Sequence, residues 1–504
     1  MTIPRTESPS GFLSGSAGGA LLFLALLGLG KFAYAQTGST GSVDAPPGLR
    51  QLLQRVPVDS NGLTPDRVAE TVLRESPDLK ARTQEVLAAS AAVDQARVAF
   101  LPKLTASGMV GKASQIQSSD FGNLVVAPGA PQGPLAPGTP LANEPITLPP
   151  SPTHRYALQA SLDIPLSDYL LRTRQALSSA QNNKASVELN RQAAVVSAAS
   201  EARVLFYNWV RAQLQSVVAE QALRQSKDHL QDVNNAFEAG TASRADVLSS
   251  ESQESRSELL LQRARDLTAF AEQQLRIAMH EATAEGYRVR ENLFAADFTD
   301  RWGEDLASLQ REAIEARLEP RAFERSSDGL KDQGKVATAG IFPKLDGIAS
   351  VLYGNPNTTI YPLRDGFITT WVVGLQASWE INGIPDAIAA RRGFEARAEE
   401  AQARRRGAED SIRTEVAQNW QALQDARAAA QWSRRSLLSA EEAYRVRREL
   451  FQNGRASNVE LTDAETDLTN SRFSVVDAEI DLRIAAVRLT HATGRDLPGG
   501  SGNR

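Results

Sequence analysis

The chain has 504 residues, of which 6% are aromatic and 23% are charged, and its formal net charge is −5. Alanine, arginine, glutamine, glutamate and leucine dominate, which is typical of long helices and coiled coils rather than of a thick globular core. The mild charge gives no support to nucleic-acid binding, and the lack of cysteine excludes disulfides, thiolate metal sites, cysteine nucleophiles and lipid attached to cysteine.

Residues 1–35 have the features of a cleaved secretory signal peptide. Arg5 precedes a short apolar run, and Ala33-Tyr34-Ala35 has the small-x-small form of a cleavage site. The run is shorter than a membrane-spanning helix requires, and an uncleaved anchor is the alternative. Because no later segment approaches a spanning helix, we expect an exported chain that crosses a membrane, if at all, as strands.

A polar leader, residues 36–62, precedes a helical pattern that runs from residue 63 to about residue 100, where Pro102 ends it. Two stretches of alternating apolar and polar residues follow, at 103–112 and 156–164. A period of two over about nine residues has the length of a tilted membrane-spanning strand. An ordinary half-buried strand would show the same alternation, so one segment does not decide.

A proline-rich connection separates these two strands. Prolines recur at every third position from Pro128 to Pro140, and more follow at 145, 149, 150 and 152. This spacing favours an extended, solvated polyproline conformation that cannot join a sheet. We expect an exposed loop on the outer side.

Two turn motifs show that the chain is internally duplicated. The segments AFEAGTASRADVL at 236–248 and LFQNGRASNVEL at 450–461 each carry a glycine, Gly240 or Gly454, after a long helical pattern. Each restarts at a serine with an acidic residue three positions later, the signature of a helix N-terminus. The predicted parts are a first repeat (63–280, hairpin tip 237–243), an equatorial linker (281–305), a second repeat (306–494, hairpin tip 451–457) and a C-terminal tail (495–504).

The second repeat contains strand patterns at 344–353 and 367–381. Trp371 and Trp379 lie eight residues apart on the apolar face of the second strand, about 26 Å along it. This separation fits aromatic belts at two membrane interfaces, and a soluble sheet core is the alternative. Four strands are too few to close a barrel, and open edges are not tolerated in lipid. Two chains would supply eight strands and three would supply twelve.

The helical segments predict a hollow tube. The long helix at 167–236 is about 105 Å long, which two shorter helices stacked end to end, 64–99 and 243–279, would match. Apolar residues recur every three or four positions through 461–492, as in a coiled-coil seam. A solitary antiparallel coiled coil would show the same seam, but it would not need paired strands.

These features together resemble a TolC-type outer-membrane efflux channel. The resemblance covers about residues 48–494 and rests on the doubled tip motif and the doubled strands. It implies a mainly α-helical fold with a membrane β-barrel part: a homotrimer with a twelve-stranded barrel in the outer membrane and a long helical tunnel through the periplasm. A periplasmic adaptor and an inner-membrane pump of the RND, ABC or MFS type would expel drugs, metals, small molecules or proteins through this passive duct. No cofactor is implied.

The resemblance also assigns roles to particular residues. The adaptor-contacting tips would be Ala239, Gly240, Thr241, Asn453, Gly454 and Arg455, and acidic residues at the periplasmic entrance would be Asp246, Glu460 and Asp463. Family members close the entrance through links from the first acidic residue to a tyrosine and an arginine of the second tip. Phe451 and Ala456 stand there in this chain, so those links cannot form as the family makes them.

Two other interpretations remain open. Asp246 and Glu460 are also explained as helix-capping residues, a role compatible with selectivity. A periplasmic coiled-coil scaffold or adaptor without a pore is the competing function. Enzymatic chemistry has little support, because no catalytic motif is present and the four histidines, at positions 154, 229, 280 and 491, are isolated in the sequence.

Overall fold

The computed structural model describes residues 62–114, 120–129, 133–147, 152–281, 286–290, 305–361 and 363–496. The predicted signal peptide, nearly all of the leader, most of the equatorial linker and most of the C-terminal tail lie outside these residues.

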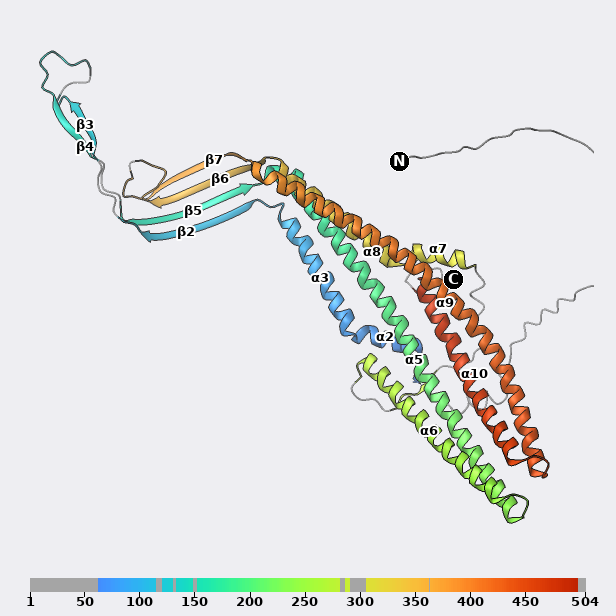
Figure 1. Ribbon diagram of the computed structural model, residues 1–504. Coiled ribbons are helices and arrows are strands. Elements are labelled where there is room, and N and C mark those ends of the chain that lie inside the picture. Colours follow the sequence, from blue (N-terminus) through green and yellow to red (C-terminus); the bar gives the residue numbers. More distant parts are fainter. Residues whose placement is uncertain are drawn as a thin grey trace, which may run out of the picture. The chain divides into compact units, whose positions relative to one another are not determined.

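The first repeat contains two short helices, a pair of strands, a long helix and a returning helix (Figure 1). In chain order its elements are α2 (Pro65–Glu75), α3 (Pro77–Val98), β2 (Lys103–Lys112), β3 (Asp120–Val126), β4 (Ala142–Thr147), β5 (His154–Ile164), α4 (Leu166–Asp168), a π-helical turn (Tyr169–Thr173), α5 (Arg174–Glu238) and α6 (Arg244–Met279).

The second repeat has the same order without the extra strands β3 and β4. Its elements are α7 (Leu306–Ala316), α8 (Leu318–Thr338), a 3-10 turn (Ala339–Ile341), β6 (Lys344–Asn355), β7 (Ile368–Ser378), a second 3-10 turn (Ile381–Gly383), α9 (Ile384–Gln452) and α10 (Asn458–Ala492).

The helix that precedes the strands is broken in each repeat, which corrects the prediction of one continuous helix. In the first repeat Ser76 is non-helical, with ψ of 121°, because it precedes Pro77. Its hydroxyl accepts a hydrogen bond from the Leu79 amide and so caps α3. In the second repeat Arg317 is extended, with ψ of 143°, and Pro320 falls in the first turn of α8, where a missing N–H is tolerated.

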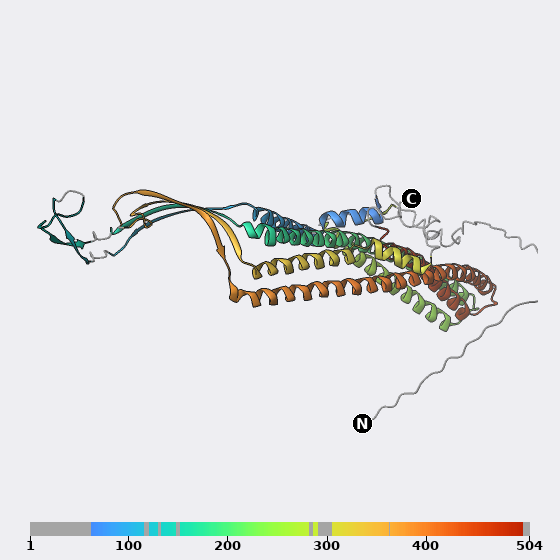
Figure 2. The same cartoon turned by 90° about the horizontal axis from the view of Figure 1, so that it is seen from above.

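The long helices pack as two hairpins, α5 with α6 and α9 with α10 (Figure 1). Helix α10 also packs along α5, and α8 contacts both α5 and α9, so that α8 lies between these two helices in Figure 2. The two hairpins are therefore joined along their length rather than at a single crossing.

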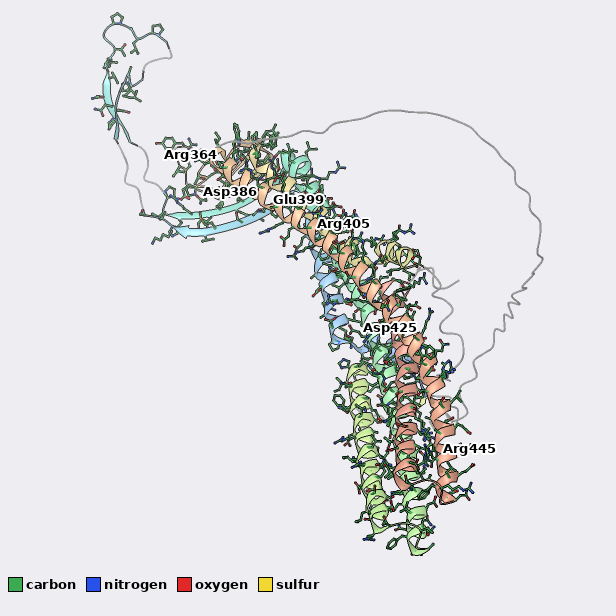
Figure 3. All side chains as sticks on the ribbon, turned by 45° about the vertical axis from the view of Figure 1, so that its right-hand side comes forward. Arg364, Asp386, Glu399, Arg405, Asp425 and Arg445 are labelled. Carbon is green, nitrogen blue, oxygen red and sulfur yellow. The ribbon has the colours of Figure 1, made fainter. Side chains whose placement is uncertain are left out.

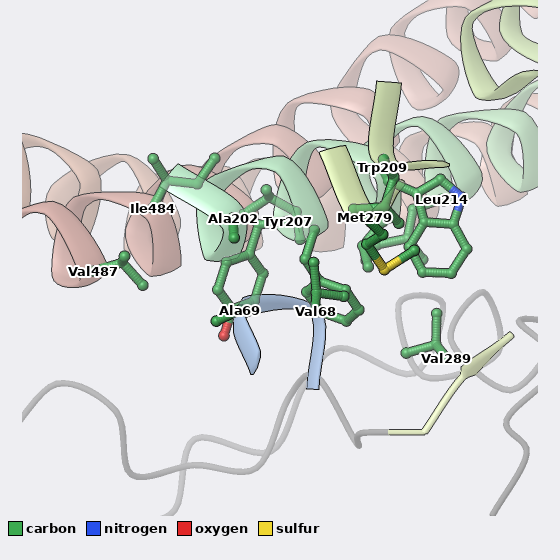
Figure 4. Close-up of a cluster of buried hydrophobic side chains, with 14 of the residues drawn as sticks. Val68, Ala69, Ala202, Tyr207, Trp209, Leu214, Met279, Val289, Ile484 and Val487 are labelled. Carbon is green, nitrogen blue, oxygen red and sulfur yellow. The ribbon is translucent and has the colours of Figure 1, made fainter. Parts of the chain in front are cut away.

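The apolar core is thin and distributed along the helices. Its largest cluster forms where α2, α5, α6 and α10 meet, and Trp209 and Met279 are almost completely buried there (Figure 4). Many of the other buried residues along α5, α9 and α10 are alanines, which allow close approach of helix backbones. Charged side chains follow α9 from Asp386 to Arg445 (Figure 3), as expected for a helix in contact with water.

Strands β2, β5, β6 and β7 form one antiparallel sheet in that order. The register aligns apolar residues on one face in rows that cross the sheet: Ala106, Ala160, Val351 and Trp371 form one row, and Leu104, Leu162, Ala349 and Val373 form the next. The opposite face carries Ser107, Gln159, Leu352 and Thr370 in one such row. Most of the large apolar side chains on the first face are exposed.

The proline-rich connection contains a second sheet, which corrects the prediction that it stays out of any ladder. Strands β3 and β4 pair antiparallel, and Pro145 lies opposite Asn123, where the register shifts. A two-stranded sheet leaves one side of each strand unpaired, so a proline can sit in β4 without removing a ladder hydrogen bond.

Among the described helices, none has the length and apolar character needed to cross a membrane.

Candidate functional site

The first hairpin tip is a complete Schellman turn. Gly240 has φ of 77°, a left-handed conformation that suits glycine. Its amide donates to the Phe237 carbonyl at 2.9 Å, and the Thr241 amide donates to the Ala236 carbonyl at 2.8 Å. These two bonds satisfy the last carbonyls of α5 and reverse the chain into α6.

The second tip repeats this geometry. Gly454 has φ of 71°, its amide donates to the Phe451 carbonyl at 2.9 Å, and the Arg455 amide donates to the Leu450 carbonyl at 2.8 Å. The six residues assigned to adaptor contact, Ala239, Gly240, Thr241, Asn453, Gly454 and Arg455, are all exposed. The first turn therefore presents backbone and small side chains to any docking partner, and the second also presents the polar side chains of Asn453 and Arg455.

Capping boxes start the returning helices. The Asp246 carboxylate accepts from the Ser243 amide at 2.9 Å, and the Ser243 hydroxyl accepts from the Asp246 amide. Glu460 and Ser457 make the same exchange at the start of α10. Hydrogen bonds from the Ser243 side chain and amide lower the pKa of Asp246. The pKa of Glu460 is lowered by the Ser457 amide and then by Arg447.

The two acidic residues assigned to the entrance on α10 differ in their surroundings. The Arg447 guanidinium donates to Glu460 at 2.6 Å, so a cation from α9 offsets much of the Glu460 charge. Asp463 lies three residues further along α10, on the neighbouring position of the same face, and is exposed. Asp463 is therefore the residue whose charge is more available to a passing solute.

Acid should loosen both turns. Because the pKa values of Asp246 and Glu460 are lowered in the folded chain, their capping contribution is present above the ordinary carboxyl pKa and is lost as pH falls below about 4. We expect amide hydrogen exchange at residues 243–247 and 457–461 to accelerate relative to the helix centres in that range. In Glu460→Gln the second turn should lose this acid dependence, and an unchanged profile would contradict the assignment.

A buried polar cluster joins the two hairpins near their tips. His229 of α5 is within 2.9 Å of the Glu465 carboxylate and within 2.8 Å of the Asn458 side-chain oxygen, both on α10. The Asn458 amide nitrogen donates to the main-chain carbonyl of Asp246 at 3.2 Å. The Phe451 ring packs edge-on against the His229 ring, with centroids 5.6 Å apart.

The fold therefore gives His229, which is isolated in the sequence, partners from α9 and α10. The sequence contains a signal for this cluster: Asn458 and Glu465 follow the same three-and-four spacing as Leu461 and Leu468 on the seam of α10. Polar residues at seam positions indicate a buried partner.

The two tryptophans predicted to lie at the membrane interfaces occupy different structural positions. Trp371 is central in β7, on the exposed apolar face. Trp379 lies one residue beyond the end of β7, which corrects the prediction that the strand continues to residue 381. Its indole N–H donates to the Ile341 carbonyl at 3.2 Å, at the junction between the sheet and the helices. Ile381 begins the following 3-10 turn.

Comparison with known families decides between the channel and the scaffold. The family model described as outer membrane efflux protein matches residues 68–279 and 309–495, one segment for each repeat. The chain belongs to the outer membrane efflux protein family. It is an outer-membrane channel of the TolC type, a passive duct for substrates expelled from the inner membrane, and nothing supports the scaffold alternative.

Solved channels share the fold of this efflux protein. The outer-membrane channel OprN is 20% identical, with a TM-score of 0.68, and the match covers 88% of this chain and 95% of OprN. CusC is 16% identical with a TM-score of 0.70, over 87% and 93% of the two chains. The open state of MtrE from Neisseria gonorrhoeae is 17% identical with a TM-score of 0.67, over 85% and 88%. No curated protein matched the chain.

Within the described part of this efflux protein, no group of three or more histidine, aspartate or glutamate side chains could hold a metal ion. Members of its family work with a periplasmic adaptor and an inner-membrane pump, so the energy for transport comes from outside the chain.

Proposed function

We propose that three copies of this chain close a twelve-stranded barrel. The observation that carries the proposal is the sheet order, which leaves β2 and β7 as edge strands with unpaired backbone groups. An exposed apolar face belongs in lipid, and lipid does not tolerate open edges. Because each of the three successive pairings is antiparallel, β7 runs opposite to β2, so β7 of one copy can continue the antiparallel pattern with β2 of the next.

A head-to-tail ring of this kind closes on itself when the number of copies fits the curvature. Four strands from each of three chains give twelve, with the row of Ser107, Gln159, Leu352 and Thr370 facing a wet interior and the row of Trp371 facing lipid. The helices then extend the interior as a tunnel whose far end is formed by the two tips.

Cross-linking tests the stoichiometry directly, because the natural chain has no cysteine. With Ser107→Cys in β2 and Thr370→Cys in β7, a bifunctional maleimide should give dimers and trimers and no larger species. Ser107→Cys alone supplies the matched control and should stay monomeric on a denaturing gel. A ladder that ends at dimers, or that continues past trimers, would overturn the trimer.

The export route of the chain belongs to the same proposal. A cleaved signal peptide at residues 1–35 would deliver it to the periplasm, and without cysteine it would be held in the outer membrane by its strands alone, without a lipid anchor. The tips would dock a periplasmic adaptor that links the channel to a pump of the RND, ABC or MFS type. No step of this role requires catalysis by the chain.

The entrance residues give a second test. We expect Glu460→Gln with Asp463→Asn to lower the preference of the channel for cations in planar bilayers, because acidic side chains at a constriction attract cations. Glutamine is chosen as the replacement at position 460 because it can still complete a capping box. Arg447→Gln should raise the cation preference, since it frees the Glu460 charge. Equal reversal potentials for the natural channel, the double variant and Arg447→Gln would show that these residues do not line the entrance.

A further inference from the structure

The polar side chains around His229 need hydrogen-bond partners within the protein because they are buried. The residues His229, Asn458 and Glu465 are 4%, 5% and 6% exposed, and Ser250 of α6 is 2% exposed. Water therefore has little access to these groups, and their donors and acceptors are satisfied mainly within the cluster.

The orientation of Asn458 is fixed by its neighbours. The Asp246 main-chain carbonyl can only accept, so the Asn458 atom 3.2 Å away must be the amide nitrogen. The Asn458 oxygen then faces His229 Nε2 at 2.8 Å and also accepts from the Ser250 hydroxyl at 3.4 Å. Since this oxygen has no proton to give, His229 must donate from Nε2.

The second ring nitrogen of His229, Nδ1, shows how many protons the His229–Glu465 pair carries. His229 Nδ1 lies 2.9 Å from the Glu465 carboxylate, a distance that requires one proton between the two atoms. That proton is on histidine, giving an imidazolium and a carboxylate, or on glutamate, giving a neutral pair. In both cases the His229–Glu465 pair carries one more proton than neutral histidine with ionised glutamate. Without that proton, a ring lone pair would face a carboxylate oxygen inside the protein.

We propose that His229, Asn458 and Glu465 form a clasp that holds the two hairpin tips of one chain together and that requires this proton. The clasp joins α5 to the first turns of α10, and through the Asp246 carbonyl it also holds the start of α6. The proposal deepens the channel assignment by naming positioning residues at the entrance.

The direction of the pH dependence follows from linkage. The clasped state binds one more proton than the separated hairpins do once histidine is neutral and glutamate is ionised in water. Rising pH therefore favours separation of the tips, and falling pH favours the clasp.

The other groups around the cluster do not reverse this direction. Helix α9 contributes Phe451 and Tyr444, whose pKa is raised by burial and by Glu465, so the tyrosine stays neutral throughout. Arg448 of α9 and Arg472 of α10 act on the same tyrosine and keep their charge. Helix α6 contributes Ser250 and a main-chain carbonyl, which do not titrate, and Arg256, which lines the same pocket as Glu465 and keeps its charge.

Spin-label distances between the tips test the clasp without relying on transport. Cysteines introduced at the exposed positions Thr241 and Arg455 would carry the labels, in chains diluted with unlabelled ones so that each distance reports a single chain. We expect a narrow distribution at about pH 6 and a longer or broader one at about pH 9. An unchanged wild-type distribution would overturn the proposal even if the channel function stands.

A matched pair of variants separates the proton requirement from simple packing. In Glu465→Gln the side-chain amide can donate to a neutral His229, so the cluster is satisfied without the extra proton and the distribution should be narrow at both pH values. Glu251→Gln makes the same change at the duplicated position on α6, which is exposed, and should behave like the natural chain. His229→Ala should be broad at both values. A Glu465→Gln chain that still responds to pH would refute the clasp.

Discussion

An arginine at Val373 should largely prevent the channel from assembling in the outer membrane. Val373 lies in β7 on the apolar face, next to Ala349 of β6, and its side chain is 70% exposed in the single chain. A cation on the lipid side of a membrane strand costs about 2–4 kcal/mol near the bilayer centre, and a trimer incurs this cost three times. The expected result is loss of the heat-resistant oligomer from outer-membrane extracts, as judged on a denaturing gel.

Val372 provides the control for this prediction. It is the adjacent residue, it has the same side chain, and it lies on the opposite face, where it is 50% exposed. An arginine there would point into a wet interior, so Val372→Arg should assemble close to the natural level. Equal assembly of the two variants would show that neither face meets lipid, and it would contradict the proposed barrel.

Proline at Gly454 should disconnect the channel from its adaptor. The turn needs φ of 71° at this position and an amide that donates to the Phe451 carbonyl. Proline is fixed near φ of −65° and has no N–H, so the second tip must adopt a different shape. We expect capture of a periplasmic adaptor in cross-linked cells to fall by roughly tenfold or more, which corresponds to about 1.4 kcal/mol.

Gly454→Asn distinguishes turn geometry from the mere absence of glycine. Asparagine enters the left-handed region at modest cost, so this variant should keep the tip and most of the adaptor capture. The trimer should survive in both variants, because the strands proposed to close the barrel precede α5 and α9, whereas the tips follow the other ends of these long helices. A proline variant that captures the adaptor normally would show that the second tip does not dock.

Patterns that are local in the chain were readable from the sequence. The glycines of the tips, the serine and acidic residues of the capping boxes and the period of two in β2 and β5 depend on neighbours within a few residues, and the structure has these features at the predicted places. The predictions from sequence were wrong where a local preference competed with pairing between segments. Proline favoured a solvated loop at residues 128–152, yet β3 and β4 pair because a two-stranded sheet leaves room for Pro145.

The duplication, the helical and stranded segments and the reversal points can be read from the amino-acid sequence, because periodicity and turn chemistry act over short range. Which distant residues meet depends on how the helices pack. His229 and Glu465 are 236 residues apart and have no shared pattern, so their contact depends on α5 and α10 packing side by side. The balance of charge at the entrance was hidden for the same reason, since Arg447 reaches Glu460 only after the chain has turned at Gly454.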